Sequence, residues 1–210
     1  MFVKNIMVPK HQCVTVAYDE SLQAALDRLE RYDIDSVPVL RDGKYAGVVT
    51  RYGIYEDFFR ADQPKESFLA GTKAGEAARR KDVYFHGQEV LEEALLILKS
   101  FPIVPIVDEE QRFAGIVTRT DVLEQFRSAF GVGRSGIRIA IACMESEGQI
   151  AKLSELTKSF HENIISLATF DEEDKLVRRI VLKVEKNQKV EKFISRLEQA
   201  GFKILSISET

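Results

Sequence analysis

Cysteine is scarce in this chain, which has only Cys13 and Cys143 among 210 residues. Two cysteines so far apart in sequence do not form a disulfide framework, so we expect reduced thiols. No apolar run approaches the roughly 18–20 residues of a membrane-spanning helix. Residues 1–7 also lack the apolar core of a secretory signal. The sequence therefore predicts a cytoplasmic protein with no membrane partner.

An excess of positive charge is also lacking. The 30 Lys and Arg residues are outnumbered by 33 Asp and Glu, which gives a net charge of −3. No basic field is available for nucleic acid, and the basic run 79–81 is too short for a footprint. The histidines His11, His86 and His161 are scattered, without Cys or carboxylate at metal-ligand spacing. The acidic run 171–174 lacks the glycine pattern of a calcium loop and is typical of a solvated turn. No catalytic nucleophile signature occurs, so we expect neither a metal site nor an enzyme.

What the chain does contain is a segment that occurs twice. Residues 47–53, Gly-Val-Val-Thr-Arg-Tyr-Gly, reappear at 115–121 as Gly-Ile-Val-Thr-Arg-Thr-Asp. In both copies the order is a short β piece, an amphipathic helix, a Val-Pro-aliphatic strand, an acidic turn, a second strand and a second helix. The predicted strands are 14–16, 37–40 and 45–49 in the first copy and 83–85, 104–107 and 113–117 in the second. The first helices carry Leu22, Ala25, Leu26 and Leu29 in copy one and Leu91, Ala94, Leu95 and Leu98 in copy two, and the second helices are expected at about 53–59 and 121–130.

Local signals refine this layout. Asp19 stands just before the first helix, where we expect its carboxylate to accept a bond from a free backbone N–H. Because proline cannot donate to a strand ladder, the strands with Pro38 and Pro105 should begin at the proline or lie at a sheet edge. The predicted domains are repeat one at 1–60, a polar linker at 61–73 and repeat two at 74–130.

Thr118 and Asp121 stand three residues apart at a predicted strand-to-helix junction. In a first helical turn this spacing puts both on one face, beside free N–H groups and the positive end of the helix dipole. The carboxylate could accept both hydroxyls of a ribose, while the Thr hydroxyl and Arg119 could bind a phosphate. The alternative is structural, with Thr118 as helix cap and Asp121 as a favourable first-turn acid.

The repeated Gly-aliphatic-aliphatic-Thr-x-x-Asp motif after a Val-Pro-aliphatic strand resembles the tandem CBS (cystathionine β-synthase) domain pair, or Bateman module, over about residues 1–130. The resemblance implies a pseudo-two-fold pair of repeats with two clefts between them. Such clefts commonly bind AMP, ADP, ATP or S-adenosylmethionine as regulatory ligands, with no other cofactor required. It also implies that one repeat supplies the ribose and phosphate contacts and the other sandwiches the adenine.

Carried onto this chain, the resemblance implies one intact nucleotide site. It would use Thr118, Arg119 and Asp121 from copy two. Copy one would contribute its N-terminal segment and the residues around its Val-Pro, namely Phe2, Ile6, Met7, Ile34, Asp35, Ser36 and Val37. In the second cleft, around Thr50 and Arg51, Gly53 stands where the carboxylate is expected. We therefore expect one nucleotide per chain, with the Gly53 cleft empty, weak or adapted to another ligand.

Residues 131–136 match the letters Gly-x-Gly-x-x-Gly. A dinucleotide-binding loop must follow a strand and open a helix, whereas this one follows a helix and precedes a strand, so we interpret it as a flexible linker. From residue 137 the pattern predicts strand, helix, two strands, helix and strand, with Gly201 at a helix C-cap. The expected fold class is α+β, with two β-α-β-β-α repeats followed by a ferredoxin-like βαββαβ domain at 137–210.

This last domain resembles an ACT domain in topology and in the glycine of its first loop. The resemblance implies association through strands or helices and amino-acid binding near that loop, at Glu147, Gly148, Gln149 and Asn163. An acidic loop disfavours a carboxylate ligand, so dimerisation alone and ligand sensing both stay open. A CBS pair followed by one ACT unit is also similar to the acetoin-utilisation regulatory proteins of bacteria.

Two functional hypotheses follow. In the first, the chain is a regulatory homodimer that senses an adenine nucleotide and acts on a partner protein. In the second, it is a constitutive oligomerisation or scaffold module that binds a partner protein without nucleotide.

Overall fold

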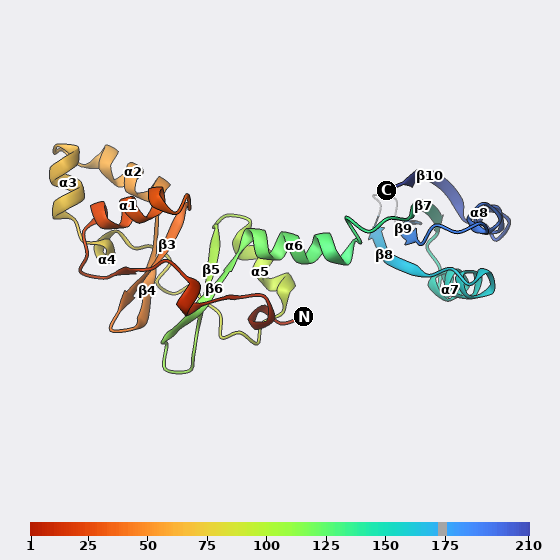
Figure 1. Ribbon diagram of the computed structural model, residues 1–210, viewed down its shortest axis with the longest axis horizontal. Helices are drawn as coiled ribbons and strands as arrows, with labels where there is room; N and C mark the ends of the chain where they lie inside the picture. Colours follow the sequence, from red (N-terminus) through yellow and green to blue (C-terminus); the bar gives the residue numbers. More distant parts are fainter. Residues whose placement is uncertain (172–175) are drawn as a thin grey trace. The chain divides into compact units, whose positions relative to one another are not determined.

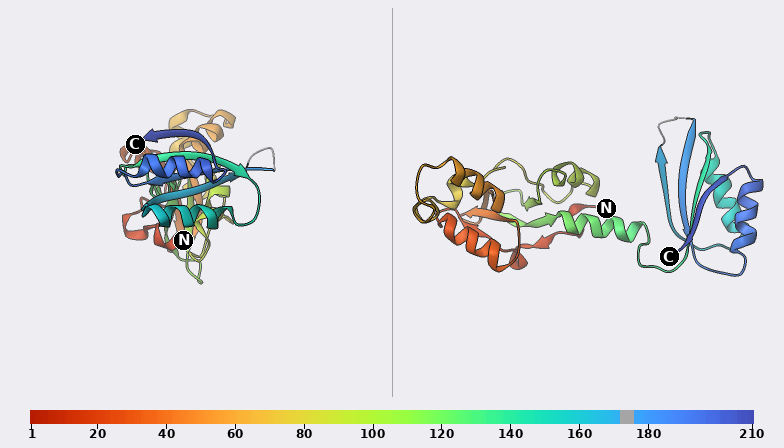
Figure 2. Two further views of the ribbon diagram at one scale, coloured as in Figure 1. Left: turned by 90° about the vertical axis from the view of Figure 1, so that its right-hand side faces the viewer. Right: turned by 90° about the horizontal axis from the view of Figure 1, so that it is seen from above.

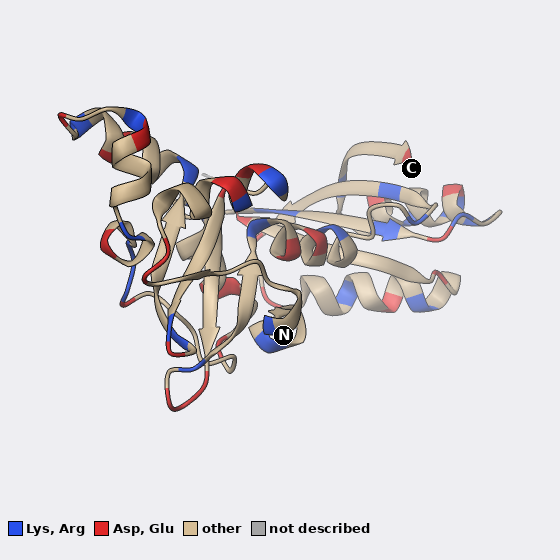
Figure 3. Ribbon diagram, turned by 60° about the vertical axis from the view of Figure 1, so that its left-hand side comes forward, with Lys and Arg blue, Asp and Glu red and all other residues tan. Residues whose placement is uncertain are grey.

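The computed structural model describes residues 1–171 and 176–210 (Figure 1). The chain forms two compact units, Met1–Leu123 and Glu124–Thr210, whose boundary falls inside helix α6 (Arg119–Ala129). Figure 3 shows Lys and Arg interspersed with Asp and Glu over the helices and loops. No helix in the described part of the chain is long and apolar enough to cross a membrane.

Repeat one is a small sheet covered by helices. Strands β3 (Ser36–Arg41) and β4 (Lys44–Thr50) are antiparallel, and Asp42 and Gly43 both have positive φ in the turn between them, as an Asp-Gly hairpin requires. β2 (Val16–Ala17) pairs in parallel with β3. Helices α1 (Leu22–Arg31) and α2 (Arg51–Arg60) pack on this sheet, and all four stripe residues predicted for the first helix are buried.

Repeat two has the same element order. Strands β5 (Ile103–Val107) and β6 (Phe113–Thr118) are antiparallel and lead into α6, while α5 (Leu91–Leu98) precedes them. The piece predicted as a strand at 83–85 forms only one parallel bridge, from Phe85 to Ile106. The duplication seen in the sequence is therefore a structural duplication in its α-β-β-α part.

The two repeats exchange their leading segments. β1 (Val8–Pro9), near the start of repeat one, pairs with β6 of repeat two. Arg79, near the start of repeat two, pairs with Val48 in β4 of repeat one through two backbone bonds of 2.9 Å. Short 3-10 turns, η1 (Val3–Asn5) and η2 (Lys10–Gln12), flank β1. Each cleft between the repeats is therefore bordered by a segment of both.

A buried cluster joins the repeats. It contains Tyr45 and Val48 from repeat one and Ile103 and Val107 from repeat two. The Tyr45 hydroxyl donates a 2.7 Å hydrogen bond to the Arg80 carbonyl. Burial, with a smaller contribution from nearby Asp82, raises the pKa of Tyr45 well above its usual range. Tyr45 therefore stays neutral and holds the segment around Arg80 against repeat one.

The prediction of the first helix cap was wrong. The N-cap of α1 is Ser21, whose hydroxyl accepts a 3.3 Å bond from Ala24, while Asp19 instead forms an exposed ion pair with Lys73. Ser21 is the residue directly before the first helical turn, and Asp19 stands too early to reach its N–H groups.

The prolines follow the prediction only in part. β5 is an edge strand of its sheet, as expected, but β3 is central, and Pro38 lies inside it. β2 reaches β3 only at Val39 and Leu40, so the side of Pro38 without a donor meets no strand. Locally, Pro38 is still at an edge.

The segment 61–73, expected as a polar linker, contains a helix. α3 (Lys65–Gly71) buries Phe68 and Leu69 in the core of repeat one, and α4 (Ala74–Ala77) follows. The charged residues around these two apolar side chains concealed the pattern, since one helical turn of apolar residues is too short for a periodicity.

The C-terminal unit has the predicted βαββαβ order. The antiparallel sheet order is β10-β7-β9-β8, and helices α7 and α8 cover one face of it (Figure 2). The elements are β7 (Ile137–Met144), α7 (Gln149–Phe160), β8 (Ile164–Asp171), β9 (Val177–Val184), α8 (Val190–Gln199) and β10 (Lys203–Glu209). The predicted acidic turn 171–174 lies, apart from Asp171, outside the described residues.

The glycine-rich segment 131–136 is packed against the sheet. Gly136 exchanges two 3.0 Å backbone bonds with Thr210, and the Ser166 hydroxyl donates to the Phe130 carbonyl at 3.0 Å. A Cβ at Gly136 would lie 2.5 Å from the Val184 carbonyl oxygen. The sequence predicted a flexible linker here, and in the structure Gly131 and Gly136 permit close packing of its two ends on the sheet.

Candidate functional site

The Thr-x-x-Asp motif of repeat two is a reciprocal helix cap. Asp121 Oδ2 accepts bonds from the backbone N–H and the hydroxyl of Thr118, at 2.8 and 2.7 Å, and the Asp121 N–H donates to Thr118 Oγ1 at 3.1 Å. This is the capping-box arrangement, which satisfies free donors of the first turn. The structural alternative for these two residues is thus observed, and a ligand contact would have to coexist with it.

The equivalent position in repeat one has half of this cap. Thr50 Oγ1 accepts a 2.9 Å bond from the Gly53 N–H, but Gly53 has no carboxylate to return one. A Cβ at Gly53 would lie 3.0 Å from Thr50 Oγ1 and 3.8 Å from the guanidinium of Arg79. A cation therefore lies close to the place where repeat two carries its acid.

A cleft of about 780 Å³ opens at this half-cap. It is lined from repeat one by Asp35, Thr50, Arg51, Tyr52 and Tyr55, and from the second half of the unit by Arg79, Arg80, Ser100, Phe101, Pro102 and Arg119. Thr118 and Asp121 are not among its lining residues. The large cleft is thus the one in which the sequence predicted no ribose acceptor.

Two of the four arginines in the large cleft are held by protein groups. Arg79 forms ion pairs with Glu56 and Asp57 at 2.6 and 2.7 Å, and its hydrogen bond holds the pKa of Glu56 below its usual range. Arg51 donates to the carbonyls of Leu29 and Ile34, both at 3.0 Å. Its Nε is buried without a hydrogen-bond partner, 3.8 Å from Asp35.

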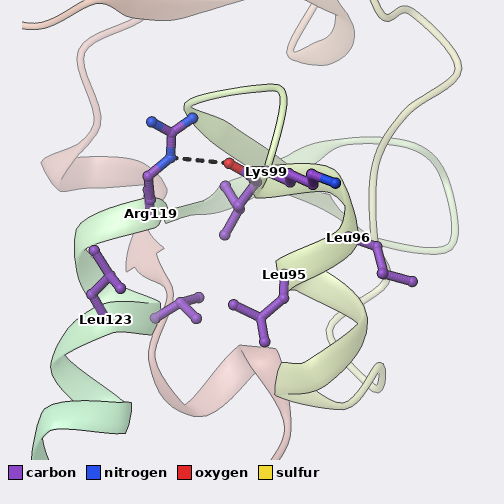
Figure 4. Close-up of a pocket in the computed structure, with 7 residues that line it drawn as sticks. Leu95, Leu96, Lys99, Arg119 and Leu123 are labelled. Carbon is purple, nitrogen blue, oxygen red and sulfur yellow. Dashed lines mark hydrogen bonds between the residues drawn. The ribbon is translucent and has the colours of Figure 1, made fainter. Parts of the chain in front are cut away.

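The other two arginines have no carboxylate partner among the described residues. Arg119 donates from Nε to the Leu98 carbonyl at 3.0 Å, and Figure 4 shows its two terminal nitrogens pointing away from that bond. The Arg80 guanidinium lies over the Phe101 ring, 5.4 Å from its centroid. Two guanidinium groups thus line the cleft with donors to spare, and arginine prefers carboxylate or phosphate partners.

The residues predicted to complete the Thr118–Asp121 site lie in different places. The N-terminal segment does run beside it, since Val8 pairs with Ile116. Asp35 lines the large cleft instead, Ser36 is buried, and Val37 is completely buried in the core of repeat one. Of the other residues, Phe2 is exposed, while Ile6 and Met7 are half-buried.

Sequence reasoning missed Cys13 as a neighbour of this site. Burial raises the pKa of its thiol, and the charge of nearby Asp121 raises it further. The exchange of leading segments brings the two together, and no short-range pattern reports such an exchange. Arg80 and Phe101 were missed for the same reason, because they come from parts of repeat two outside the repeated motif.

In the C-terminal unit, three of the four predicted loop residues come together. Glu147, Gly148 and Gln149 line a hollow of about 600 Å³ beside Arg178, which is paired with Glu145. Gly148 has φ 83° at the start of α7. Asn163 does not line this hollow, and its carbonyl accepts a bond from Glu185.

One curated relative is similar to about two thirds of the chain. The inosine-5′-monophosphate dehydrogenase of Methanocaldococcus jannaschii is 28% identical over 145 residues, which are 66% of this chain and 27% of that enzyme. The chain thus spans about a quarter of the length of that relative.

Solved structures agree with the fold. CBSX2 in complex with AMP is 26% identical, with a TM-score of 0.52, over 60% of this chain and 95% of that one. CbpB in complex with c-di-AMP is 18% identical, with a TM-score of 0.53, over 61% and 85%. The CBS domain model matches residues 3–58 and 74–128, more than half of the chain. The chain therefore belongs to the CBS domain family, of which it carries a tandem pair.

Proposed function

We propose that the chain is a non-catalytic regulatory protein whose CBS pair binds an adenine nucleotide in the large cleft. The observation that carries the proposal is that Arg80 and Arg119 both line this cleft without a carboxylate partner among the described residues. The similarity to CBSX2, which was solved with AMP, supports an adenine nucleotide as the ligand.

The size and chemistry of the large cleft suit such a ligand. Its volume of about 780 Å³ lies in the range of small-molecule sites, about 300–1,000 Å³. Arg80 and Arg119 would bind phosphate oxygens, and the Thr50 hydroxyl lies in the same cleft, at the start of α2. Tyr52 and Tyr55 are 74% and 39% exposed and offer ring faces to a base.

The Thr118–Asp121 site predicted from the sequence remains the second proposed location. Asp121 uses one carboxylate oxygen in the cap, and an ionised carboxylate accepts at both oxygens. A ribose there would bind beside the N-terminal segment of the chain. The two locations differ in their arginines and in their acid, so substitutions can separate them.

Regulation would arise because both repeats line the large cleft. A ligand that bridges them therefore favours one relative arrangement. A ligand shifts such an equilibrium only by its difference in affinity for the two arrangements. The nucleotide would thereby control how the pair presents itself to a partner protein.

The test is isothermal titration calorimetry of the full chain with AMP, ADP, ATP and S-adenosylmethionine. Variants Arg80→Gln and Asp121→Ala report the large cleft and the Thr118–Asp121 site respectively. Arg112→Gln is the matched control, because Arg112 is exposed in repeat two and does not line the large cleft. We expect AMP affinity to fall about tenfold in Arg80→Gln and to persist in the control.

Each outcome assigns the site. A loss confined to Asp121→Ala moves the ligand to the second location, and losses in both variants indicate that both clefts are used. If none of the four compounds binds at millimolar concentration, the sensor proposal is wrong.

An apolar groove favours the alternative function of a constitutive oligomerisation or scaffold module. Between α5 and α6, about 570 Å³ is lined mainly by leucines and Val122 (Figure 4). Leu96 and Leu123 are 78% and 58% exposed. In this alternative the groove binds protein, and nucleotide has no effect.

We further propose that the C-terminal unit is an ACT-like domain that dimerises the chain or senses an amino acid. Its βαββαβ topology supports the resemblance, and Glu147, Gly148 and Gln149 line a hollow. The acidic residues of that loop favour dimerisation over amino-acid binding.

A further inference from the structure

Lys183 is a buried cation in the C-terminal unit. It lies on β9 between Leu182 and Val184, whose side chains belong to the core beneath α7 and α8. Because side chains alternate along a strand, Lys183 lies on the opposite, helix-free face of the sheet. The residue is only 5% exposed.

The ammonium group of Lys183 has one neutral partner. Its Nζ donates a 3.0 Å bond to the Gly131 carbonyl, and no described carboxylate pairs with it. A buried charge is costly unless it is paired and fully hydrogen-bonded. A lysine ammonium has three donors, so this one is incompletely satisfied.

The glycine-rich segment forms a wall beside this lysine. Gly131 has φ 65°, and a Cβ there would lie 2.6 Å from Ile165. Together with the Ser166 and Thr210 bonds described above, this close packing fixes the segment across the helix-free face.

A cavity of about 280 Å³ lies where this segment, the sheet and Thr210 meet. Its polar lining residues are Arg138, Ser166, Lys183 and Thr210, and its apolar ones are Phe130, Val132, Phe170 and Val181, with Gly133. Arg138 and Ser166 are the strand partners of Lys183 on either side. Among the side chains that line the cavity, two are cationic and none is acidic.

We propose that this cavity binds a small organic carboxylate. The carboxylate would lie between Lys183 Nζ and the Arg138 guanidinium, where it supplies the anion that the buried lysine lacks. The apolar part of the ligand would pack on Phe130, Phe170 and Val181. The volume is about twice that of a cavity that holds benzene, about 150 Å³, so a short branched or single-ring acid fits.

The site is separate from the proposed nucleotide clefts and from the Glu147–Gln149 loop. None of its lining residues occurs in those sites. The proposed site gives a ligand-binding role to the segment 131–136, which the sequence predicted to be only a linker.

The experiment is titration of the ¹⁵N-labelled full chain, followed by NMR, with phenylacetate and isovalerate as probes. Phenylacetamide tests the charge, since it has the same ring and no carboxylate, and inorganic phosphate tests whether any anion suffices. We expect saturable shifts at the amides of Ser166, Val181 and Lys183 with at least one acid, and none with phenylacetamide or phosphate.

Two variants and a matched control assign the binding to this cavity. Lys183→Met keeps a long side chain and removes the charge. Arg138→Gln removes the second cation, and Arg138 is not fully buried, so this variant should fold. Lys203→Met removes an exposed cation from the same sheet. We expect affinity to fall tenfold or more in the first two variants and to be unchanged in Lys203→Met.

Five results would overturn the proposal. Four concern the ligands: no shift with either acid at millimolar concentration, equal affinity for phenylacetamide, binding of phosphate but of neither acid, and unchanged acid affinity in both Lys183→Met and Arg138→Gln. Concentration-dependent shifts of the same amides without ligand would also overturn it, because a second copy of the chain would then cover this face.

Discussion

Asp121 and Thr118 bond each other reciprocally at the start of α6, whereas Thr50 at the start of α2 faces a glycine. The duplicated motif is thus a complete helix cap in one repeat and half a cap in the other. The half-capped end borders the large, arginine-lined cleft. The difference between Asp121 and Gly53 therefore concerns stability as well as binding.

Asp121→Ala should lower the free energy of unfolding by about 1 kcal/mol, since it removes the acceptor for two Thr118 donors. Urea denaturation followed by circular dichroism measures this change. The effect should be present without any nucleotide. If stability is unchanged, the reciprocal cap contributes nothing, and the motif has to be explained by ligand binding alone.

Gly53→Asp should raise the free energy of unfolding by about 1 kcal/mol, because it completes the cap of α2 and removes a helical glycine. The new carboxylate would also lie close to Arg79. Gly53→Ala is the control that isolates helix propensity from capping. Equal stabilities of the Asp and Ala variants would contradict the capping argument.

The pH dependence of stability should contain a contribution from Glu20. This residue accepts two bonds from Arg28, at 2.6 and 2.7 Å, and one from the Ala17 N–H. The hydrogen bond from Arg28 holds the pKa of Glu20 below its usual value. A depressed folded-state pKa stabilises the fold above the unfolded pKa of about 4.3, and this stabilisation is lost as the pH falls through the folded value.

Glu20→Gln should therefore cost about 0.5–1 kcal/mol at pH 7, a value limited by the partial exposure of the pair. The difference from the wild type should shrink as the pH is lowered below about 4. Glu30→Gln, an exposed change on α1, the helix that carries Arg28, is the control and should cost little. A difference that is constant from pH 7 to pH 3 would exclude the linkage.

The order of elements was predictable because it rests on local patterns. The stripe from Leu22 to Leu29 gave a helix, and Asp42-Gly43 gave a hairpin turn. The pairing of Val8 with Ile116 was not predictable, since it joins residues more than a hundred positions apart. For this reason Thr50 and Arg51 were recognised, while Arg80 and Phe101, which share their cleft, were missed.

Gly136→Ala should destabilise the C-terminal unit by about 2 kcal/mol, because the new Cβ would meet the Val184 carbonyl oxygen at 2.5 Å. Gly133→Ala is the comparison, since nothing lies within 4 Å of its Cβ and only its positive φ is penalised. We expect a cost there of about 1 kcal/mol. Thermal unfolding of the full chain measures both, and equal costs would contradict the packing of this segment on the sheet.

The groove between α5 and α6 separates the two functional proposals. If it holds the chain in an oligomer, Leu96→Glu and Leu123→Glu should lower the mass measured by light scattering without unfolding the monomer, because both side chains are largely exposed. Leu205→Glu, a change at an exposed leucine on the edge strand β10, tests the C-terminal sheet edge as the alternative interface. Dissociation by the groove variants together with intact AMP binding would make the groove an interface and leave the cleft as the sensor. An unchanged mass in both groove variants would remove the observation that favours a scaffold.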